Sequence, residues 1–88
     1  MRYGLVSRVY EDRDALIKGA TAVAQTIASK SLMATAFTKR AIKQTYELGE
    51  TAAIAHERSL FIAAMSTQDK REGIKAFNEK RKPDFKNR

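Results

Sequence analysis

The first patterned stretch of the chain is GLVSRVY, residues 4–10, which is short and rich in β-branched side chains. If it is extended, Leu5, Ser7 and Val9 face one side and the residues between them face the other. This pattern predicts one strand. Because a single strand cannot satisfy its own backbone groups, we expect its partners to lie outside this chain, or the segment to extend as an arm.

Beyond residue 12, apolar positions recur at helical spacings in four successive stretches. The four apolar stripes are Leu16, Ala20, Val23 and Ile27; Ala34, Phe37, Ala41 and Leu48; Ile54, Phe61 and Met65, joined by Leu60 and Ala64; and Ile74 with Phe77. The predicted fold is therefore mainly α, with one short N-terminal strand followed by four helices. A chain of 88 residues has limited volume to bury all these stripes, so we expect it to associate with further polypeptide.

Capping residues predict where these helices begin and end. The expected N-caps, whose side chains can accept a hydrogen bond from a free backbone N–H group, are Asp12, Ser31, Thr51 and Thr67. The first helix is expected to end at residues 29–31 and the second at Gly49. Pro83 is expected to end the fourth helix, because proline cannot donate a further helical hydrogen bond.

The composition limits the class of protein. The chain has 88 residues, of which 43% are hydrophobic and 31% charged, and this favours one ordered domain over a disordered segment. No apolar run reaches the ~18 residues of a membrane-spanning helix, so no membrane span is expected. The stretch MRYGLVSRVYED has neither a signal-peptide layout nor an amphipathic presequence, so no targeting signal is visible.

Few residues here are suited to nucleophilic or metal chemistry. The absence of cysteine excludes a disulfide framework, a thiol nucleophile and zinc–thiolate sites. His56 is the single histidine, so no metal site is expected. No serine forms a recognisable triad with it, and we predict a surface or interface position for its side chain.

Positive charge is concentrated at the C-terminal end of the chain. Between Lys70 and Arg88 there are eight basic and three acidic residues, which places +5 of the net charge of +7 in this region. An anionic partner is therefore expected: a phosphate, a nucleic acid or an acidic protein face. Phe77 and Phe85 could stack on bases. However, no helix-turn-helix, zinc-finger or RNA-recognition signature is present, so nucleic acid is not the partner we favour.

With the elements in order, four stretches carry a family resemblance: GLVSRVYEDRDAL, AQTIASKS, TKRAIKQTYELG and HERSLFIAAMSTQDKREGIKAFNEKRKPDF. Together they resemble the C-terminal third of the enoyl-CoA hydratase/isomerase (crotonase) superfamily, and most of all the short-chain enoyl-CoA hydratases. The resemblance covers essentially the whole chain. One departure is Leu32, where many relatives carry proline after the serine.

The resemblance implies a fold, an assembly and a substrate. Residues 1–88 would be the C-terminal helical region of a crotonase fold, which closes a coenzyme A pocket and builds the trimer, whereas the catalytic ββα-spiral core lies outside this chain. The implied partners are that core, neighbouring subunits in a homotrimer or dimer of trimers, and acyl-CoA. No cofactor is implied beyond the coenzyme A thioester, which is the substrate. The implied compartment is the mitochondrial matrix or the cytoplasm.

The resemblance also assigns three substrate-binding residues. Phe61 and Phe77 match aromatic residues that line the acyl and pantetheine end of the pocket, and Lys80 matches a lysine near the phosphates of coenzyme A. The alternatives are core packing for the two phenylalanines and a solvated helix-end lysine for Lys80. Arg81 and Lys82 are predicted to be solvated. The chain's glutamates do not match the catalytic positions, so no catalytic residue is predicted.

Two functions from different classes remain open. The first is the C-terminal part of an enoyl-CoA hydratase, which hydrates 2-enoyl-CoA in fatty-acid β-oxidation and is inactive as this segment alone. The second is a non-catalytic, crotonase-derived helical subunit that serves assembly within a larger complex.

Overall fold

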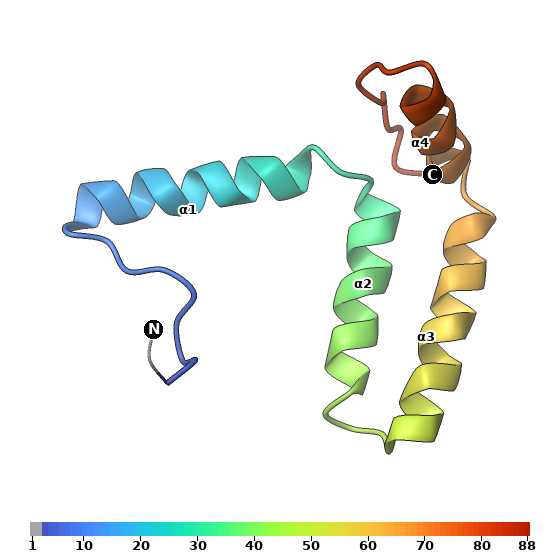
Figure 1. The fold of residues 1–88 in the computed structure, drawn as a ribbon, viewed down its shortest axis with the longest axis horizontal. Helices are drawn as coiled ribbons and strands as arrows, with labels where there is room; N and C mark the ends of the chain where they lie inside the picture. The colour runs from blue at the N-terminus through green and yellow to red at the C-terminus, as the bar shows by residue number, and fades with distance from the viewer. Residues whose placement is uncertain (1–2) are drawn as a thin grey trace.

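The computed structural model describes residues 3–88, and helices account for most of them (Figure 1). Helix α1 spans Arg13–Ala28, α2 spans Leu32–Gln44, α3 spans Glu50–Met65 and α4 spans Gln68–Asn78. The predicted mainly α fold with four helices is confirmed.

The strand predicted over residues 4–10 is not formed. Within residues 3–88 there is no strand, and this segment is an irregular arm that turns back from the start of α1 (Figure 1). The ring of Tyr10 packs so closely on Gly19 of α1 that a Cβ atom there would displace it. A strand needs a partner for its backbone groups, and residues 3–88 supply none to this arm.

Three of the four predicted N-caps are confirmed. The side chains of Asp12, Ser31 and Thr67 each accept a hydrogen bond from a backbone N–H group in the first turn of α1, α2 and α4 respectively. The prediction for Thr51 is wrong, because α3 begins two residues earlier behind Gly49, which has extended backbone and no side-chain cap. The expected end of the second helix at Gly49 is also too late, since α2 ends at Gln44.

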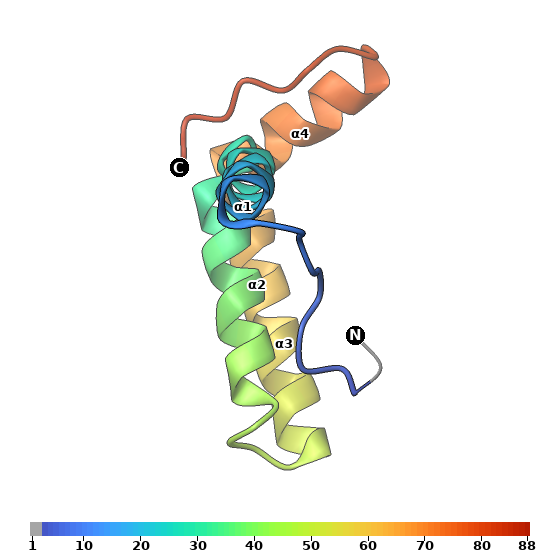
Figure 2. The same cartoon turned by 90° about the vertical axis from the view of Figure 1, so that its left-hand side faces the viewer.

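Helices α2 and α3 form an antiparallel hairpin and lie side by side in both ribbon views (Figure 1, Figure 2). Leu60 is the buried residue of α3, with 9% of its surface exposed. Ala53 and Ala64, seven residues before it and four after it, are half-buried on the same face. The predicted α3 stripe is therefore confirmed for Leu60 and Ala64 and wrong for Ile54, Phe61 and Met65, which are exposed.

Most of the apolar surface of this chain is left uncovered. Helix α1 extends away from the α2–α3 hairpin (Figure 1) and has no buried residue. The radius of gyration is 16.5 Å, whereas a compact domain of this length has about 12 Å. The accessible surface is 7844 Å², against about 5,200 Å² for a folded monomer of this mass. The segment therefore has the shape of an element that packs on other polypeptide.

This exposure predicts the behaviour of the isolated chain. The 88-residue polypeptide should associate or aggregate at low micromolar concentration, because the apolar faces of α1 and α3 have no cover within the described residues. Sedimentation velocity tests this. A sharp monomeric boundary near 9.9 kDa, together with a cooperative thermal transition, would contradict the expectation.

Candidate functional site

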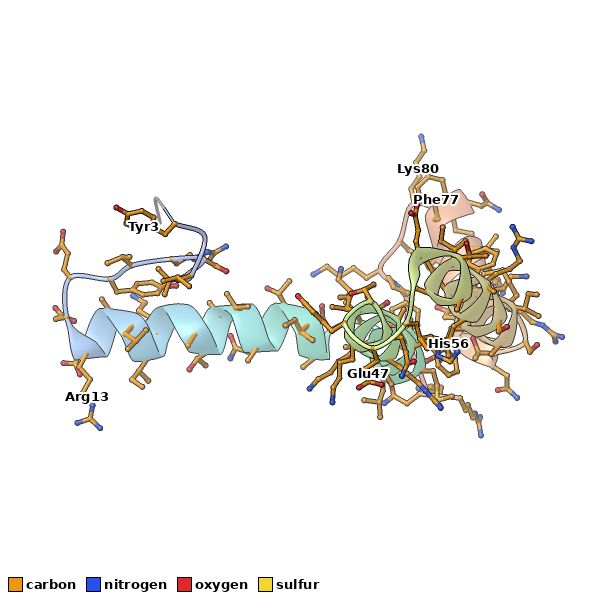
Figure 3. All side chains as sticks on the ribbon, turned by 90° about the horizontal axis from the view of Figure 1, so that it is seen from below. Tyr3, Arg13, Glu47, His56, Phe77 and Lys80 are labelled. Atoms are coloured by element: carbon orange, nitrogen blue, oxygen red, sulfur yellow. The ribbon has the colours of Figure 1, made fainter. Side chains whose placement is uncertain are left out.

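Two of the three predicted site residues lie together at the end of α4. Phe77 belongs to the last turn of α4, and Lys80 follows three residues later. Both side chains project from the same side of this helix end, away from the α2–α3 hairpin (Figure 3). Phe77 is 84% exposed, so it does not pack into a core formed by residues 3–88. The pair therefore presents an apolar ring beside an ammonium group.

The backbone around Lys80 has a helix-terminating geometry in which glycine is the usual residue. The N–H of Arg81 donates to the carbonyl of Ala76 at 3.0 Å, and the N–H of Lys80 donates to the carbonyl of Phe77 at 3.2 Å. These two bonds form a Schellman motif, which requires a left-handed residue at its centre. Lys80 occupies that position with φ of 53°. The helix thus ends at this motif, and the predicted termination by Pro83 is wrong.

Phe61 lies apart from this pair. It lines a groove of about 350 Å³ between α2 and α3, together with Phe37, Ile42 and Leu60. Neither Phe77 nor Lys80 lines this groove. Phe61 is 61% exposed, so core packing within this chain is wrong for it too. The structure therefore brings two of the predicted residues together and leaves the third on a separate apolar surface.

Residues 81–88, here called the C-terminal tail, run back along α4 (Figure 2). Near their start, the Arg81 guanidinium donates two hydrogen bonds to the Glu72 carboxylate, at 2.5 and 3.1 Å. We call this pair the Glu72–Arg81 clamp. Glu72 also accepts the backbone N–H of Asp84 at 2.9 Å, and Arg81 Nε donates to Glu79 at 2.6 Å. Arg81, which was predicted to be solvated, is therefore an ion-paired residue.

The far end of the tail is held by Asp69, whose side chain is buried with 3% exposure. Its carboxylate accepts hydrogen bonds from Ser31 Oγ at 2.5 Å and from the backbone N–H groups of Lys86 at 2.8 Å and Asn87 at 3.0 Å. Its own backbone N–H donates to the carbonyl of Arg88 at 2.8 Å. The tail is thereby fixed to the start of both α2 and α4.

The pKa values of both carboxyl groups reflect these contacts. Burial favours the neutral form of Asp69, but hydrogen bonds from Ser31 and the backbone of Lys86 and Asn87 outweigh it and leave the pKa below its ordinary value. Hydrogen bonds from Arg81 and from the N–H of Asp84 lower the pKa of Glu72 to about 2. The hydrogen bonds that Arg81 donates to Glu72 and Glu79 raise the pKa of Arg81. All three groups are therefore charged at neutral pH.

Sequence reasoning missed the two residues that hold the tail. The sequence predicted no binding or structural role for Asp69, and Glu72 is one of the glutamates that match no catalytic position. A signal was present, because two acidic residues spaced i, i+3 on one helix face precede a basic segment. Without the reversal at Lys80, however, nothing in the pattern indicates that the chain turns back to meet them.

His56, for which a surface or interface position was predicted, is half-buried and lies four residues before Leu60, on the same face of α3. Its Nε2 atom is buried and has no hydrogen-bond partner within residues 3–88. No group of three or more potential metal ligands occurs in this described range. None of its helices has the length and hydrophobicity that a membrane crossing requires.

The structure is that of a helical segment whose C-terminal end carries exposed aromatic and basic side chains. The family model described as "Enoyl-CoA hydratase/isomerase" matches residues 1–88, and the chain belongs to this family. A probable enoyl-CoA hydratase of Mycobacterium leprae is 44% identical over 99% of the chain. The 2,3-dehydroadipyl-CoA hydratase of Escherichia coli is 41% identical over 97% of it. Other matched relatives include enoyl-CoA hydratases named as mitochondrial.

Solved structures agree with this assignment. An enoyl-CoA hydratase/isomerase from Mycobacterium paratuberculosis superposes on 99% of the chain with a TM-score of 0.91 at 28% sequence identity. The match covers 34% of that structure, and the chain likewise spans about a third of the length of the curated relatives it matches. The resemblance found in the sequence is therefore confirmed, and it concerns one part of these proteins.

The lowered pKa values predict an acid-sensitive tail. A carboxyl group whose pKa is lower in the folded than in the unfolded state stabilises the fold fully above its unfolded pKa. That contribution should be complete above about pH 5 and disappear as the pH falls through the range from about 4.5 to 2. NMR titration of the backbone amides of Asp84, Lys86 and Asn87 measures it. Amide shifts that change mainly between pH 5 and pH 8 would contradict this account.

Proposed function

We propose that this chain is the assembly and pocket-closing segment of an enoyl-CoA hydratase that adds water to 2-enoyl-CoA thioesters in fatty-acid β-oxidation. The catalytic glutamates and the oxyanion hole would belong to a ββα-spiral core, so this segment would be inactive alone. The observation that carries the proposal is the Phe77–Lys80 pair, exposed at one helix end in a chain of this family. The reaction uses no cofactor beyond the thioester.

The chemistry of the pair suits coenzyme A. An acyl-CoA molecule has phosphate groups at one end and an apolar acyl chain at the other. A lysine ammonium is a flexible point charge that accommodates a mobile phosphate, and the neighbouring Phe77 ring can cover the pantetheine arm beside it. Phe61 and its groove would face the acyl part. We propose Phe61, Phe77 and Lys80 as the residues of the substrate-binding wall.

The backbone of Lys80 supports a role for its side chain. An L-residue in the left-handed region is disfavoured by about 1–2 kcal/mol, and glycine would avoid this cost. Lysine nevertheless occupies the left-handed position. A residue retained against local strain is a candidate for function. Here the gain is a cation placed next to Phe77.

Assembly is the second part of the proposed role. The uncovered apolar faces of α1 and α3 would pack on the catalytic core and on neighbouring subunits, in a homotrimer or a dimer of trimers. As compartments we propose the mitochondrial matrix or the cytoplasm. The alternative function, a non-catalytic helical assembly subunit, would use the same apolar faces and is favoured by the same exposure.

The two candidate functions predict different masses for the native protein. A hydratase should have an intact mass about three times the 9.9 kDa of this chain, because the chain spans about a third of its relatives. The assembly subunit should have a mass near 9.9 kDa. Mass spectrometry of the protein purified from its source separates them, and the smaller value would overturn the hydratase proposal.

Substitution of Lys80 tests the binding role. In the full-length hydratase, Lys80→Ala should raise KM for acyl-CoA with little change in kcat, because phosphate binding is remote from the reacting atoms. The lost contact is worth about 1–3 kcal/mol. With an acyl-pantetheine substrate, which lacks the nucleotide phosphates, the loss should be smaller. Equal losses with both substrates would mean that Lys80 does not bind phosphate.

A matched variant separates the side chain from the backbone. Lys80→Gly removes the same ammonium but suits the left-handed backbone, so it should raise KM as alanine does while being more stable than Lys80→Ala by about 1 kcal/mol. The midpoint of thermal unfolding, Tm, reports the second effect.

A further inference from the structure

We propose that Glu72 and Arg81 are positioning residues for the coenzyme A contact: the Glu72–Arg81 clamp holds the chain reversal that aims Lys80 at the ligand's phosphates. The inference rests on the proposed role of Lys80 in substrate binding. Neither Glu72 nor Arg81 needs to touch coenzyme A for this role.

The geometry of the reversal carries the argument. Lys80 lies between the end of α4 and Arg81, and its left-handed backbone is a conformation that a non-glycine residue resists. Arg81 is the next residue, and Glu72 fixes its guanidinium with two hydrogen bonds at 2.5 and 3.1 Å. A bidentate pair fixes the direction of a side chain as well as its distance. The position of Arg81 therefore restricts the backbone of Lys80.

Glu72 also holds the chain beyond the reversal. The carboxylate oxygen that binds Arg81 Nη1 at 2.5 Å accepts the backbone N–H of Asp84 at 2.9 Å. One carboxylate thus closes the loop of residues 81–84 from both ends. Without it, the Schellman hydrogen bonds at residues 80 and 81 would have to oppose the strain of Lys80 with only the Arg81–Glu79 ion pair as side-chain support, and nothing would hold the backbone N–H of Asp84.

The clamp can be tested without releasing the whole tail. Asp69 holds Lys86 and Asn87 through separate hydrogen bonds, which a change at Glu72 leaves in place. Loss of the clamp should therefore loosen the reversal at Lys80 while residues 86–88 remain bound to α4. This separates a positioning effect from general unfolding.

The sign of the effect distinguishes positioning from simple electrostatics. Glu72 is negatively charged at neutral pH, and a carboxylate near a phosphate-binding lysine repels an anionic ligand. If Glu72 acted through its charge alone, Glu72→Gln would strengthen acyl-CoA binding. If it acts by holding Lys80 in place, the same substitution weakens binding, because a smaller fraction of the molecules is competent to bind.

The experiment uses the full-length hydratase with acyl-CoA and the matching acyl-pantetheine. Glu72→Gln should raise KM for acyl-CoA about three- to tenfold, corresponding to a competent fraction of about 10–30%. The kcat should be unchanged, and so should KM for acyl-pantetheine. Arg81→Lys, which keeps the charge but loses the bidentate geometry, should show the same split between substrates.

Asp84→Asn is the matched control. It removes one carboxylate from the tail, but the Asp84 side chain forms an ion pair with Lys86 and none with Arg81. It should therefore leave KM unchanged or lower it. If Asp84→Asn raised KM as much as Glu72→Gln does, the effect would belong to the tail's charge in general and the inference would be overturned.

A double substitution completes the test. If Glu72 acts through Lys80, adding Glu72→Gln to Lys80→Ala should not raise KM for acyl-CoA further. Additive losses, or a lower KM in the Glu72→Gln single variant, would overturn the inference. If Lys80→Ala alone fails to separate the two substrates, the proposed binding role fails, and the inference fails with it. If Lys80→Ala raises KM for acyl-CoA more than KM for acyl-pantetheine but Glu72→Gln does not, only the inference is overturned.

Discussion

The C-terminal half of this chain depends on one buried carboxylate. Asp69 accepts hydrogen bonds from Ser31 and from the backbone of Lys86 and Asn87, and so joins the start of α2, the start of α4 and the tail. A buried charge is tolerated only when its hydrogen bonds are satisfied, and here three donors from two distant segments satisfy it. The Asn87 side chain adds a further link by accepting the N–H of Leu32 at 3.0 Å. The tail that follows the reversal at Lys80 is therefore held at both ends, by Glu72 near its start and by Asp69 near the C-terminus.

This arrangement explains how a basic tail can be ordered. Repulsion among the cations of residues 81–88 favours an extended chain, but two acidic residues on α4 direct the tail back along the helix. Phe85 also packs on α4, where its ring lies 3.6 Å from the position of a Cβ atom on Gly73. An alanine at Gly73 would therefore make ordinary van der Waals contact with this ring. The ordered tail leaves Phe77 and Lys80 exposed together at the end of the helix.

The open shape of the molecule leaves much of its apolar surface without cover. Helices α2 and α3 pack on each other through a small face, whereas α1 and the outer side of α3 present apolar residues that nothing in residues 3–88 covers. A segment with so little core relies on contacts with other polypeptide for stability. In the proposed function, α3 would serve both roles, because its outer side would pack on other polypeptide and its Phe61 would line the substrate-binding wall.

Much of the local structure followed from the sequence. Helical periodicity and the caps at Asp12, Ser31 and Thr67 predicted the number of helices and most of their starts, because these signals act within one or two turns. The motifs near the C-terminus also pointed correctly to the family. By contrast, the strand over residues 4–10 was wrong, since alternation alone cannot show whether a partner strand exists.

Contacts between distant residues were decided only by the tertiary structure. Which side of α3 is covered was decided by its packing on α2: Leu60 and Ala64 of the predicted stripe lie on that side, whereas the larger Phe61 is exposed. The pairing of Glu72 with Arg81 required a left-handed lysine, a conformation that no local preference of lysine favours. The sequence by itself thus determined the helices and the family, through interactions between near neighbours. The tail's position was decided by hydrogen bonds that form only once the chain has turned back on itself.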